Sequence, residues 1–366
     1  MKLTKYLEEV TDFRIKGRCL HDLAEILFLI LLGTLCDCDD FLEIRDWGND
    51  ELPFLRNELG LSYVNGIPSE DTLERVMKYL NPKELEESMR KTASFIVRSL
   101  SGKQVCVDGK EHRGTIPSGQ KHALIRTVSV WIAEEKLCFG QKQIDTKSNE
   151  KVAIPALLET LDIKGAIITI DAIACHENIV KVIVDGKADY LIALKKNQGG
   201  LYEQVHDWMM SRKAQLPHYE EFNKEHGRTE KRKVYLAQDL EFLDATHSWE
   251  KLSTIVLVES TRVTPQKESI QNRFYISSLE DKQPKTYLNL SRGHWSVEND
   301  IHWQLDLTFH EDSSRIRTGN APQNMNIIRK LALFILNQNQ DKMSMKRKRK
   351  KAARDKQFLV RILNNI

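Results

Sequence analysis

Three acidic residues lie where a carboxylate could bind a metal ion. Asp108 ends the apolar alternation of QVCVD, and Asp171 ends the apolar run AIITID 63 residues later. Glu298 follows after a further 127 residues, inside the helical pattern HWSVEND. A carboxylate beside buried strand residues is strongly disfavoured unless it is paired or metal-bound, and Mg²⁺ prefers such oxygen ligands. The three residues therefore predict a two-metal site, in which one ion activates the attacking oxygen of a phosphodiester and the other stabilises the leaving oxygen. We expect Mg²⁺ there, with Mn²⁺ as the alternative.

Each acidic residue also has a simpler interpretation. An Asp at a strand end is often a helix N-cap or a turn former, and a Glu in a helix is often a solvated surface residue. Glu311 and Asp312 are the reserve candidates for the third carboxylate.

The segments around these residues predict the fold that must position them. Residues 103–111, 123–134 and 136–144 have strand patterns, and helix and strand patterns then alternate through residues 152–195. Three strands followed by this alternation is the order of the ribonuclease H-like α/β fold. We therefore expect a catalytic domain over residues 99–340, with a β-rich insertion at about residues 215–288.

The two ends of the chain differ in pattern and in charge. Residues 1–98 predict an α-helical domain for DNA binding or assembly, with Ser69 as an N-cap. Residues 1–100 carry 13 Lys+Arg and 19 Asp+Glu, whereas residues 291–366 carry 15 and 7. Residues 341–366 contain the run Lys346–Lys351 and predict a basic, solvated tail that adds non-specific affinity for a polyanion.

Several basic and aromatic residues near the carboxylates could contact DNA. The alternatives are a solvated loop for Lys110 and Arg113, and core packing for Trp295. Arg315 and Arg317 suit phosphate contacts that neutralise charge without reading sequence. The full set of candidate DNA contacts comprises Lys110, Arg113, Arg292, His294, Trp295, Arg315 and Arg317. We interpret His176 as structural.

Composition restricts the class of protein. The hydrophobic fraction of 41% and the charged fraction of 29% are typical of a globular chain, and no apolar run is long enough to cross a membrane. The segment MKLTKYLEEV lacks the apolar core of a secretion signal, so we expect a cytoplasmic protein. The six scattered cysteines contain no CxxC pair and are expected to be reduced.

Longer segments resemble the bacterial insertion-sequence DDE transposases, in particular the group of H-repeat-associated proteins. The similar segments span roughly residues 10–335 in the family's order. They are HDLAEILFLILLGTLC, PSEDTLERVMKYLNP, VDGKEHRG, IDTKSNEKVAIPALLETLDIKGAIITIDAIACHENI, DYLIALKKNQGGL and RGHWSVENDIHWQLDLTFHEDSSRIRTGNAPQNMNIIRKLAL. The last of these is the most specific.

The resemblance implies the same three carboxylates as the catalytic triad: Asp108 in VDGK, Asp171 in TIDA and Glu298 in HWxxEN. It implies a transposase that cuts and joins double-stranded DNA at terminal inverted repeats and in a target. The joining of two DNA ends favours a homodimer. It also implies that residues 1–98 are an accessory module.

This sequence departs from the family pattern at a few positions. Related transposases often have a Tyr and an Arg shortly before the Glu and a Lys seven positions after it. Here His294 stands four before Glu298, Arg292 stands six before it, and position 305 is Leu. No departure removes a carboxylate. Three other hypotheses remain: a catalytically inactive or domesticated transposase-derived DNA-binding protein, a plain nuclease of the same fold, and a helical transcriptional regulator.

Overall fold

The computed structural model of the chain describes residues 7–116, 125–144, 150–225, 228–244, 248–264 and 267–365. Two sequence-based expectations lie partly outside these residues: the absence of a secretion signal at the N-terminus, and the start of the strand predicted from Ala123. Within the described ranges, no helix has the length and apolar character needed to span a membrane. All six cysteines are free thiols, as expected.

A mixed sheet forms the centre of the molecule. Its first five strands are β1 (Gln104–Glu111), β2 (Arg126–Ile132), β3 (Leu137–Gln143), β4 (Ile167–Ile170) and β5 (Asp189–Leu194). They lie in the order β3-β2-β1-β4-β5, where β2 is antiparallel to its two neighbours and β1, β4 and β5 run parallel. This arrangement confirms the ribonuclease H-like fold class.

Helices cover both faces of these strands. On one face lie α7 (Glu150–Leu158) and α8 (Glu177–Asp185), and the Glu150 side chain of α7 rests against Gly109 of β1. On the other face lies α10 (Pro284–Ser296), where the Gln104 side chain of β1 donates to the Leu290 carbonyl. Alternate residues of β1 therefore point to different helical layers, as the pleat of a strand requires. The even-numbered residues, including Asp108 and Lys110, face α10 and the segment that follows it.

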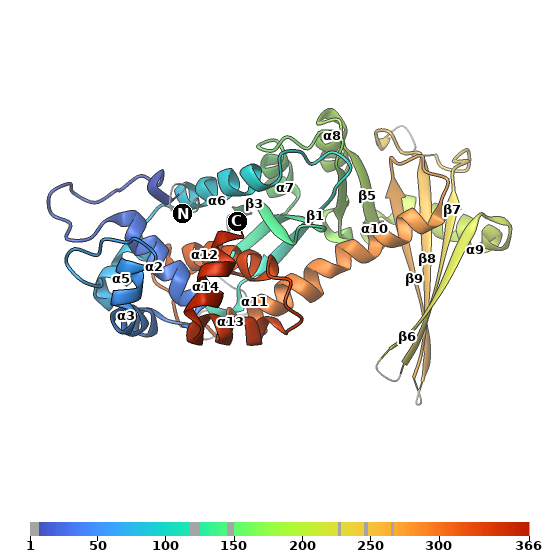
Figure 1. Cartoon of the computed structure of the whole chain (residues 1–366). Coiled ribbons are helices and arrows are strands. Elements are labelled where there is room, and N and C mark those ends of the chain that lie inside the picture. Colours follow the sequence, from blue (N-terminus) through green and yellow to red (C-terminus); the bar gives the residue numbers. More distant parts are fainter. Residues whose placement is uncertain are drawn as a thin grey trace.

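The β-rich insertion continues the same sheet. After α9 (Gly199–Arg212) come β6 (His218–Glu225), β7 (Arg228–Ala237), β8 (Thr254–Val263) and β9 (Glu268–Ser277), all antiparallel. Because β9 pairs with β5, the sheet has nine strands and extends as a long arm (Figure 1). The sequence predicted a β-rich insertion over about residues 215–288 but gave no sign of β6 as a strand. The β6 sequence HYEEFNKE has no apolar alternation to indicate a strand.

The N-terminal helices lie at the opposite end of the molecule (Figure 1). They are α2 (Leu23–Leu35), α3 (Phe41–Asp50), α4 (Leu52–Asn57), α5 (Glu70–Tyr79) and α6 (Pro82–Ile96). Ser69 caps α5 by accepting from the Thr72 amide, as predicted. The apolar helix α2 is buried along its length, and it packs against α12 (Ala321–Asn337). The helical N-terminal segment and the catalytic sheet therefore share one core.

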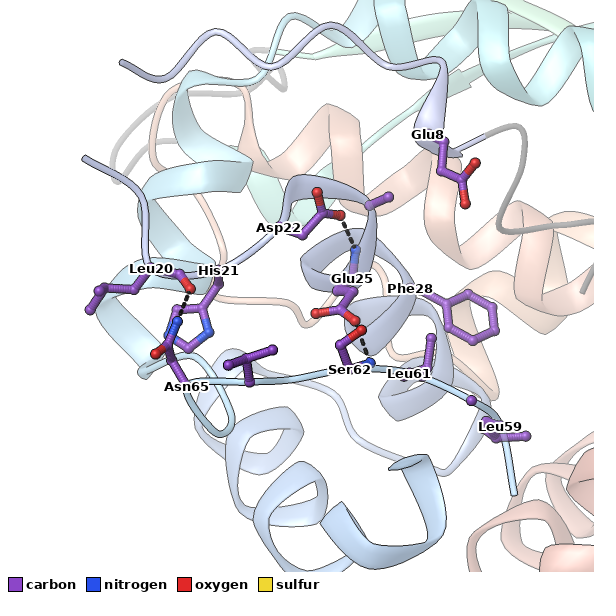
Figure 2. A pocket seen from close by; sticks show the side chains of 13 residues that line it. Glu8, Leu20, His21, Asp22, Glu25, Phe28, Leu59, Leu61, Ser62 and Asn65 are labelled. Carbon is purple, nitrogen blue, oxygen red and sulfur yellow. Dashed lines mark hydrogen bonds between the residues drawn. The ribbon is translucent and has the colours of Figure 1, made fainter. Parts of the chain in front are cut away.

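A hollow of about 630 Å³ opens on the N-terminal helices (Figure 2). Asp22 caps α2 by accepting from the Glu25 amide, and the Glu25 carboxylate accepts from the Ser62 amide at 2.6 Å. Glu8 lies on the same lining. The hollow is therefore acidic and does not suit a phosphate.

The C-terminal segment differs from the prediction of a solvated tail. It forms α13 (Met345–Arg354) and α14 (Lys356–Asn364), which pack against α12 and each other. The physical reason is twofold: α14 buries apolar residues such as Phe358 and Ile362, and α13 turns part of its basic run inward. Arg349 is 1% exposed and donates to the carbonyls of Thr34, Cys38 and Thr308. It also pairs with the Asp39 carboxylate at 2.8 Å.

Replacing Arg349 with Met should destabilise the chain by about 3–5 kcal/mol, because a buried charge pair loses one partner and several buried carbonyls lose their donor. Urea unfolding at pH 7 measures this change. The control is Arg347→Met in the same helix, where the side chain is exposed and the effect should stay within about 0.5 kcal/mol. Equal midpoints for the two variants would show that the Arg349 contacts contribute nothing.

Candidate active site

The strand register places Asp108 and Asp171 side by side. Val107 of β1 pairs with Ile170 of β4 in the parallel ladder, so the two Asp residues follow at the next position on adjacent strands. Asp108 lies inside β1 and accepts from the Gly109 amide. Asp171 directly follows β4 and accepts from the Ile173 amide, so it is also the N-cap of a short 3-10 turn. Asp171 therefore acts as a cap, as the simpler interpretation expected, and it also lies beside a second carboxylate.

Glu298 reaches this pair from a helix that changes its winding at the site. The helix α10 continues into a π-helix, Val297–His302, and then into α11 (Trp303–Leu307). The Trp303 amide donates to the Glu298 carbonyl, five residues back. Such π-turns are rare and occur frequently at functional sites. The sequence predicted one helix here, and it gave no sign of the π-turn or of the helix start at Pro284.

The three carboxylates interact electrostatically. Burial, followed by the neighbouring Asp171 and Glu298 carboxylates in that order, raises the pKa of Asp108 to about 7. A smaller contribution comes from Glu150, whose own pKa is raised by burial and by Asp171. The site therefore carries an excess of negative charge.

A divalent cation would offset this excess of negative charge, provided that the residues present can bind one. The three carboxylates are hard oxygen donors of the kind that Mg²⁺ and Mn²⁺ prefer, and among the described residues no Lys or Arg lies within ion-pair distance of them. In the part of the chain that the structure describes, however, no three Asp, Glu, His or Cys side chains already converge in ligating positions. The donor set fits the ion, and the side chains would have to close around it.

Lys110 does not face this site as a free cation. Its Nζ contacts Asp306 Oδ1 and Glu311 Oε2, both at 2.6 Å, and the side chain is buried. Glu311 also accepts from Asn326 Nδ2 at 2.6 Å. Burial would raise the pKa of Glu311, but Lys110, His112 and Arg329 outweigh it and hold that pKa well below its usual range. Lys110 and Glu311 therefore form a buried ion pair with each other.

Two residues near Asp108 were missed by the sequence analysis. His302 Nδ1 lies 3.4 Å from Asp108 Oδ2, and burial followed by the nearby Lys110 lowers the pKa of His302 to about 3. His302 and Asp306 follow Glu298 at intervals of four, a spacing that places residues on one helix face and could have revealed the set. The other missed residue, Glu150, lies so close that a Cβ on Gly109 would clash with its carboxylate. Nothing in the sequence near Glu150 pointed to β1.

A cavity of about 420 Å³ opens beside Asp171 and Glu298, towards the β arm. Trp295 is 38% exposed on its wall, and the Arg273 guanidinium lies over its ring at 4.1 Å from the centroid. Trp295 is therefore not a core residue. Lys195, Lys196 and Tyr202 line the same cavity. Its wall thus presents cations and aromatic faces next to the carboxylates.

Two further candidate DNA contacts, His294 and Arg292, already contact other side chains of the protein. His294 is half-buried, with Nδ1 3.1 Å from Thr169 Oγ1, and burial lowers its pKa to about 4. Arg292 pairs with Glu221 of the β arm at 2.7 Å, away from the carboxylates.

Arg113, Arg315 and Arg317 are exposed on two segments that touch. A Cβ at Gly114 would lie 2.8 Å from the Glu311 carbonyl, so these segments can pack only with glycine there. His176, expected to be structural, caps α8. Asp312 directly follows Glu311, and its buried Oδ1 has no hydrogen-bond partner among the described residues.

The ribonuclease H-like sheet places Asp108 and Asp171 at matching positions of two adjacent strands, and sequence comparison shows the family to which a chain with this arrangement belongs. The model of the "Transposase DDE domain" family matches residues 101–335, and the model described as "DDE_Tnp_1-associated" matches residues 4–92. The chain belongs to the DDE transposase family. This confirms the resemblance drawn from the sequence.

Individual relatives extend over nearly the whole chain. "Putative transposase YncI" of Escherichia coli O157:H7 is 34% identical over 99% of this chain and 94% of its own length. "H repeat-associated putative transposase YhhI" of Escherichia coli strain K12 is 33% identical over 99% and 97%. A cryo-EM structure of the piggyBac transposase synaptic complex with hairpin DNA aligns over 100% of this chain and 81% of that one, with 11% identity and a TM-score of 0.39.

Proposed function

We propose that this chain is an active DNA transposase whose catalytic carboxylates are Asp108, Asp171 and Glu298. The observation that carries the proposal is their mutual repulsion, because burial, Asp171 and Glu298 together raise the pKa of Asp108 to about 7. Glu311, the reserve candidate, is held by Lys110 instead. Family membership supports the same assignment.

The proposed reaction has two phosphoryl transfers. Water attacks the phosphorus at an element end, a new P–O bond forms, and the bond to the 3′-oxygen breaks, leaving a 5′-phosphate and a 3′-hydroxyl. That hydroxyl then attacks a target phosphodiester, joins to its phosphorus, and releases the target's own 3′-hydroxyl. In each transfer the nucleophile loses a proton to solvent and the leaving oxygen gains one.

The protein's own residues divide the remaining tasks. Asp108, Asp171 and Glu298 would hold two Mg²⁺ ions, which when bound activate the attacking oxygen and stabilise the leaving one. His302 orients Asp108 from the helix side. Arg113, Arg315 and Arg317 contact backbone phosphates, while Trp295 and Arg273 face the nucleotides next to the cut.

We propose double-stranded DNA as the partner, both as terminal inverted repeats and as target, bound by a homodimer in the cytoplasm. Residues 1–98 act as the accessory module, and residues 99–340 carry the chemistry.

The test is cleavage of a supercoiled plasmid that carries the element ends, with Mg²⁺ and then Mn²⁺, by wild type and by Asp171→Ala. We expect metal-dependent cuts at the ends in wild type. Asp171→Ala should lose them by more than about 100-fold, because altering even the outer-shell partners of metal ligands costs roughly 10–100-fold. Cuts that persist in Asp171→Ala would refute the assignment of this ligand.

One observation favours a second candidate, a transposase-derived protein that binds DNA without cutting it. Among the described residues, no three potential ligands stand in ligating positions. That protein would bind the element ends with unchanged affinity in wild type and Asp171→Ala, and would leave the plasmid intact with either metal.

A further inference from the structure

We propose that the outer face of α13 is a second binding surface for the sugar-phosphate backbone of duplex DNA. This α13 surface consists of Lys346, Arg347, Lys350 and Arg354. The inference rests on the DNA-cutting function proposed above and adds a site that lies outside the carboxylate cluster. The residues matched by the transposase family models end at 335, before α13 begins.

The distribution of charge points to this helix. Residues 341–366 carry 10 Lys+Arg and 2 Asp+Glu, a net charge of +8. Because the whole chain has a net charge of +3, residues 1–340 together carry −5. Most of the affinity of a protein for duplex DNA at moderate salt comes from cations that displace the counterions of phosphates. A chain that is otherwise net acidic therefore concentrates its excess of positive charge on this short segment.

The fold sorts these cations onto opposite sides of α13. Lys348 and Arg349 point inward with Ala352, whereas Lys346, Arg347, Lys350 and Arg354 are exposed. At 3.6 residues per turn, the four exposed cations lie within an arc of about 100°, opposite the buried side. They form one continuous cationic face rather than a ring of charge around a free tail.

The buried cations hold this face rigidly. Lys348 Nζ donates to the carbonyls of Leu336 at 3.1 Å and Asn339 at 2.5 Å, at the end of α12. Arg349 Nη1 donates to the Thr308 carbonyl at 2.6 Å, directly after the helical segment that carries Glu298. The helix α13 packs against α12 and α14, as Figure 1 shows. These contacts therefore hold the α13 surface in a fixed position relative to the helical segment that carries Glu298.

The four cations also have no internal role in the part of the chain that is described. The neighbouring cations are paired: Arg361 with Asp341 at 2.8 Å, and Lys356 with Glu51 at 2.6 Å. Neither Lys346, Arg347, Lys350 nor Arg354 is within ion-pair distance of a carboxylate among the described residues. The acidic hollow in Figure 2 shows that the N-terminal helices present the opposite charge on their own open surface. Phosphate is the chemistry that fits the α13 surface.

The test measures binding of the full-length Asp171→Ala protein, which cannot cut, to a random-sequence duplex at several salt concentrations. In that background, Lys346, Arg347 and Lys350 are replaced together by Gln. The slope of log affinity against log salt should fall by up to about three, since each lost phosphate contact lowers it by about one. At low salt we expect an affinity loss of about 10-fold or more.

Two matched variants make the result specific. The charge control replaces Lys164, Lys187 and Lys282 by Gln, three exposed lysines near the strand ends opposite the triad. It removes the same charge and should leave the slope nearly unchanged. The variant Lys346→Arg with Lys350→Arg keeps the charges and should keep the slope. Thermal unfolding of each protein confirms that all three variants are folded.

An unchanged slope in the Gln triple variant, or an equal fall in the charge control, would overturn the α13 surface. These outcomes are distinguishable from failure of the proposed function. If the background protein binds no duplex at all and wild type cuts none, the transposase assignment fails. If wild type cuts at the element ends but the Gln triple variant of α13 has the same salt slope as the charge control, the transposase assignment stands and only the α13 surface is wrong.

Discussion

Glu298→Gln and Glu311→Gln should produce opposite defects. Glu298→Gln removes an exposed carboxylate from the triad, so metal-dependent cleavage should fall by more than about 100-fold, beyond the roughly 10–100-fold typical of outer-shell changes. Its stability should change by no more than about 0.5 kcal/mol, as for other exposed sites. Glu311→Gln instead leaves the buried Lys110 ammonium with one carboxylate fewer. It should lose about 3–5 kcal/mol of stability.

The pair is measured by urea unfolding without metal at pH 7, and by plasmid cleavage well below the unfolding midpoint of each protein. The two substitutions are chemically identical, and each serves as the control for the other. If Glu311→Gln is as stable as wild type and cannot cut, while Glu298→Gln cuts normally, then Glu311 is the third carboxylate and our assignment is reversed.

The strand pattern predicted the core of the fold because a buried strand must be apolar over a short, continuous segment, which can be recognised in the sequence. The runs QVCVD, IITID and DYLIAL are apolar on both faces, and they became the parallel strands β1, β4 and β5. Their ends also identified Asp108 and Asp171. β6 was missed because its residues lie in an arm that water reaches on both sides, so no apolar face is required of it.

The pairing of charges could not be predicted, because it depends on how the helices dock. Lys110 stands two residues after Asp108 and was interpreted as a phosphate contact. It pairs with Asp306 and Glu311, about two hundred residues away in the chain. Arg349 lies in a run that usually indicates a solvated tail, yet it is the most deeply buried cation of that run. A sequence shows that a residue is charged, and only the fold shows whether that charge has a partner.

The repulsion at Asp108 has a consequence for stability that does not depend on catalysis. Asp108 has a side-chain exposure of 16%, and its pKa is raised from 3.8 to about 7. The folded state therefore binds this proton more tightly than the unfolded state does. The stability that results is fully present below pH 3.8 and is lost as the pH rises through about 7. Above that pH, the charged Asp108 destabilises the metal-free protein.

Asp108→Asn should consequently raise the free energy of unfolding of the metal-free protein at pH 8 by about 2–4 kcal/mol, since each pKa unit corresponds to about 1.4 kcal/mol. Near pH 3.5 the gain should vanish. Mg²⁺ should stabilise wild type at pH 8, by about 2.7 kcal/mol at one hundred times its dissociation constant, and should stabilise the Asn variant less. Urea unfolding across this pH range, with EDTA or with Mg²⁺, measures both effects. Asp185→Asn, at the exposed end of α8, is the control and should shift neither curve by more than about 0.5 kcal/mol. A gain for Asp108→Asn that is independent of pH would mean that its cause is packing and not the charge of the carboxylate cluster.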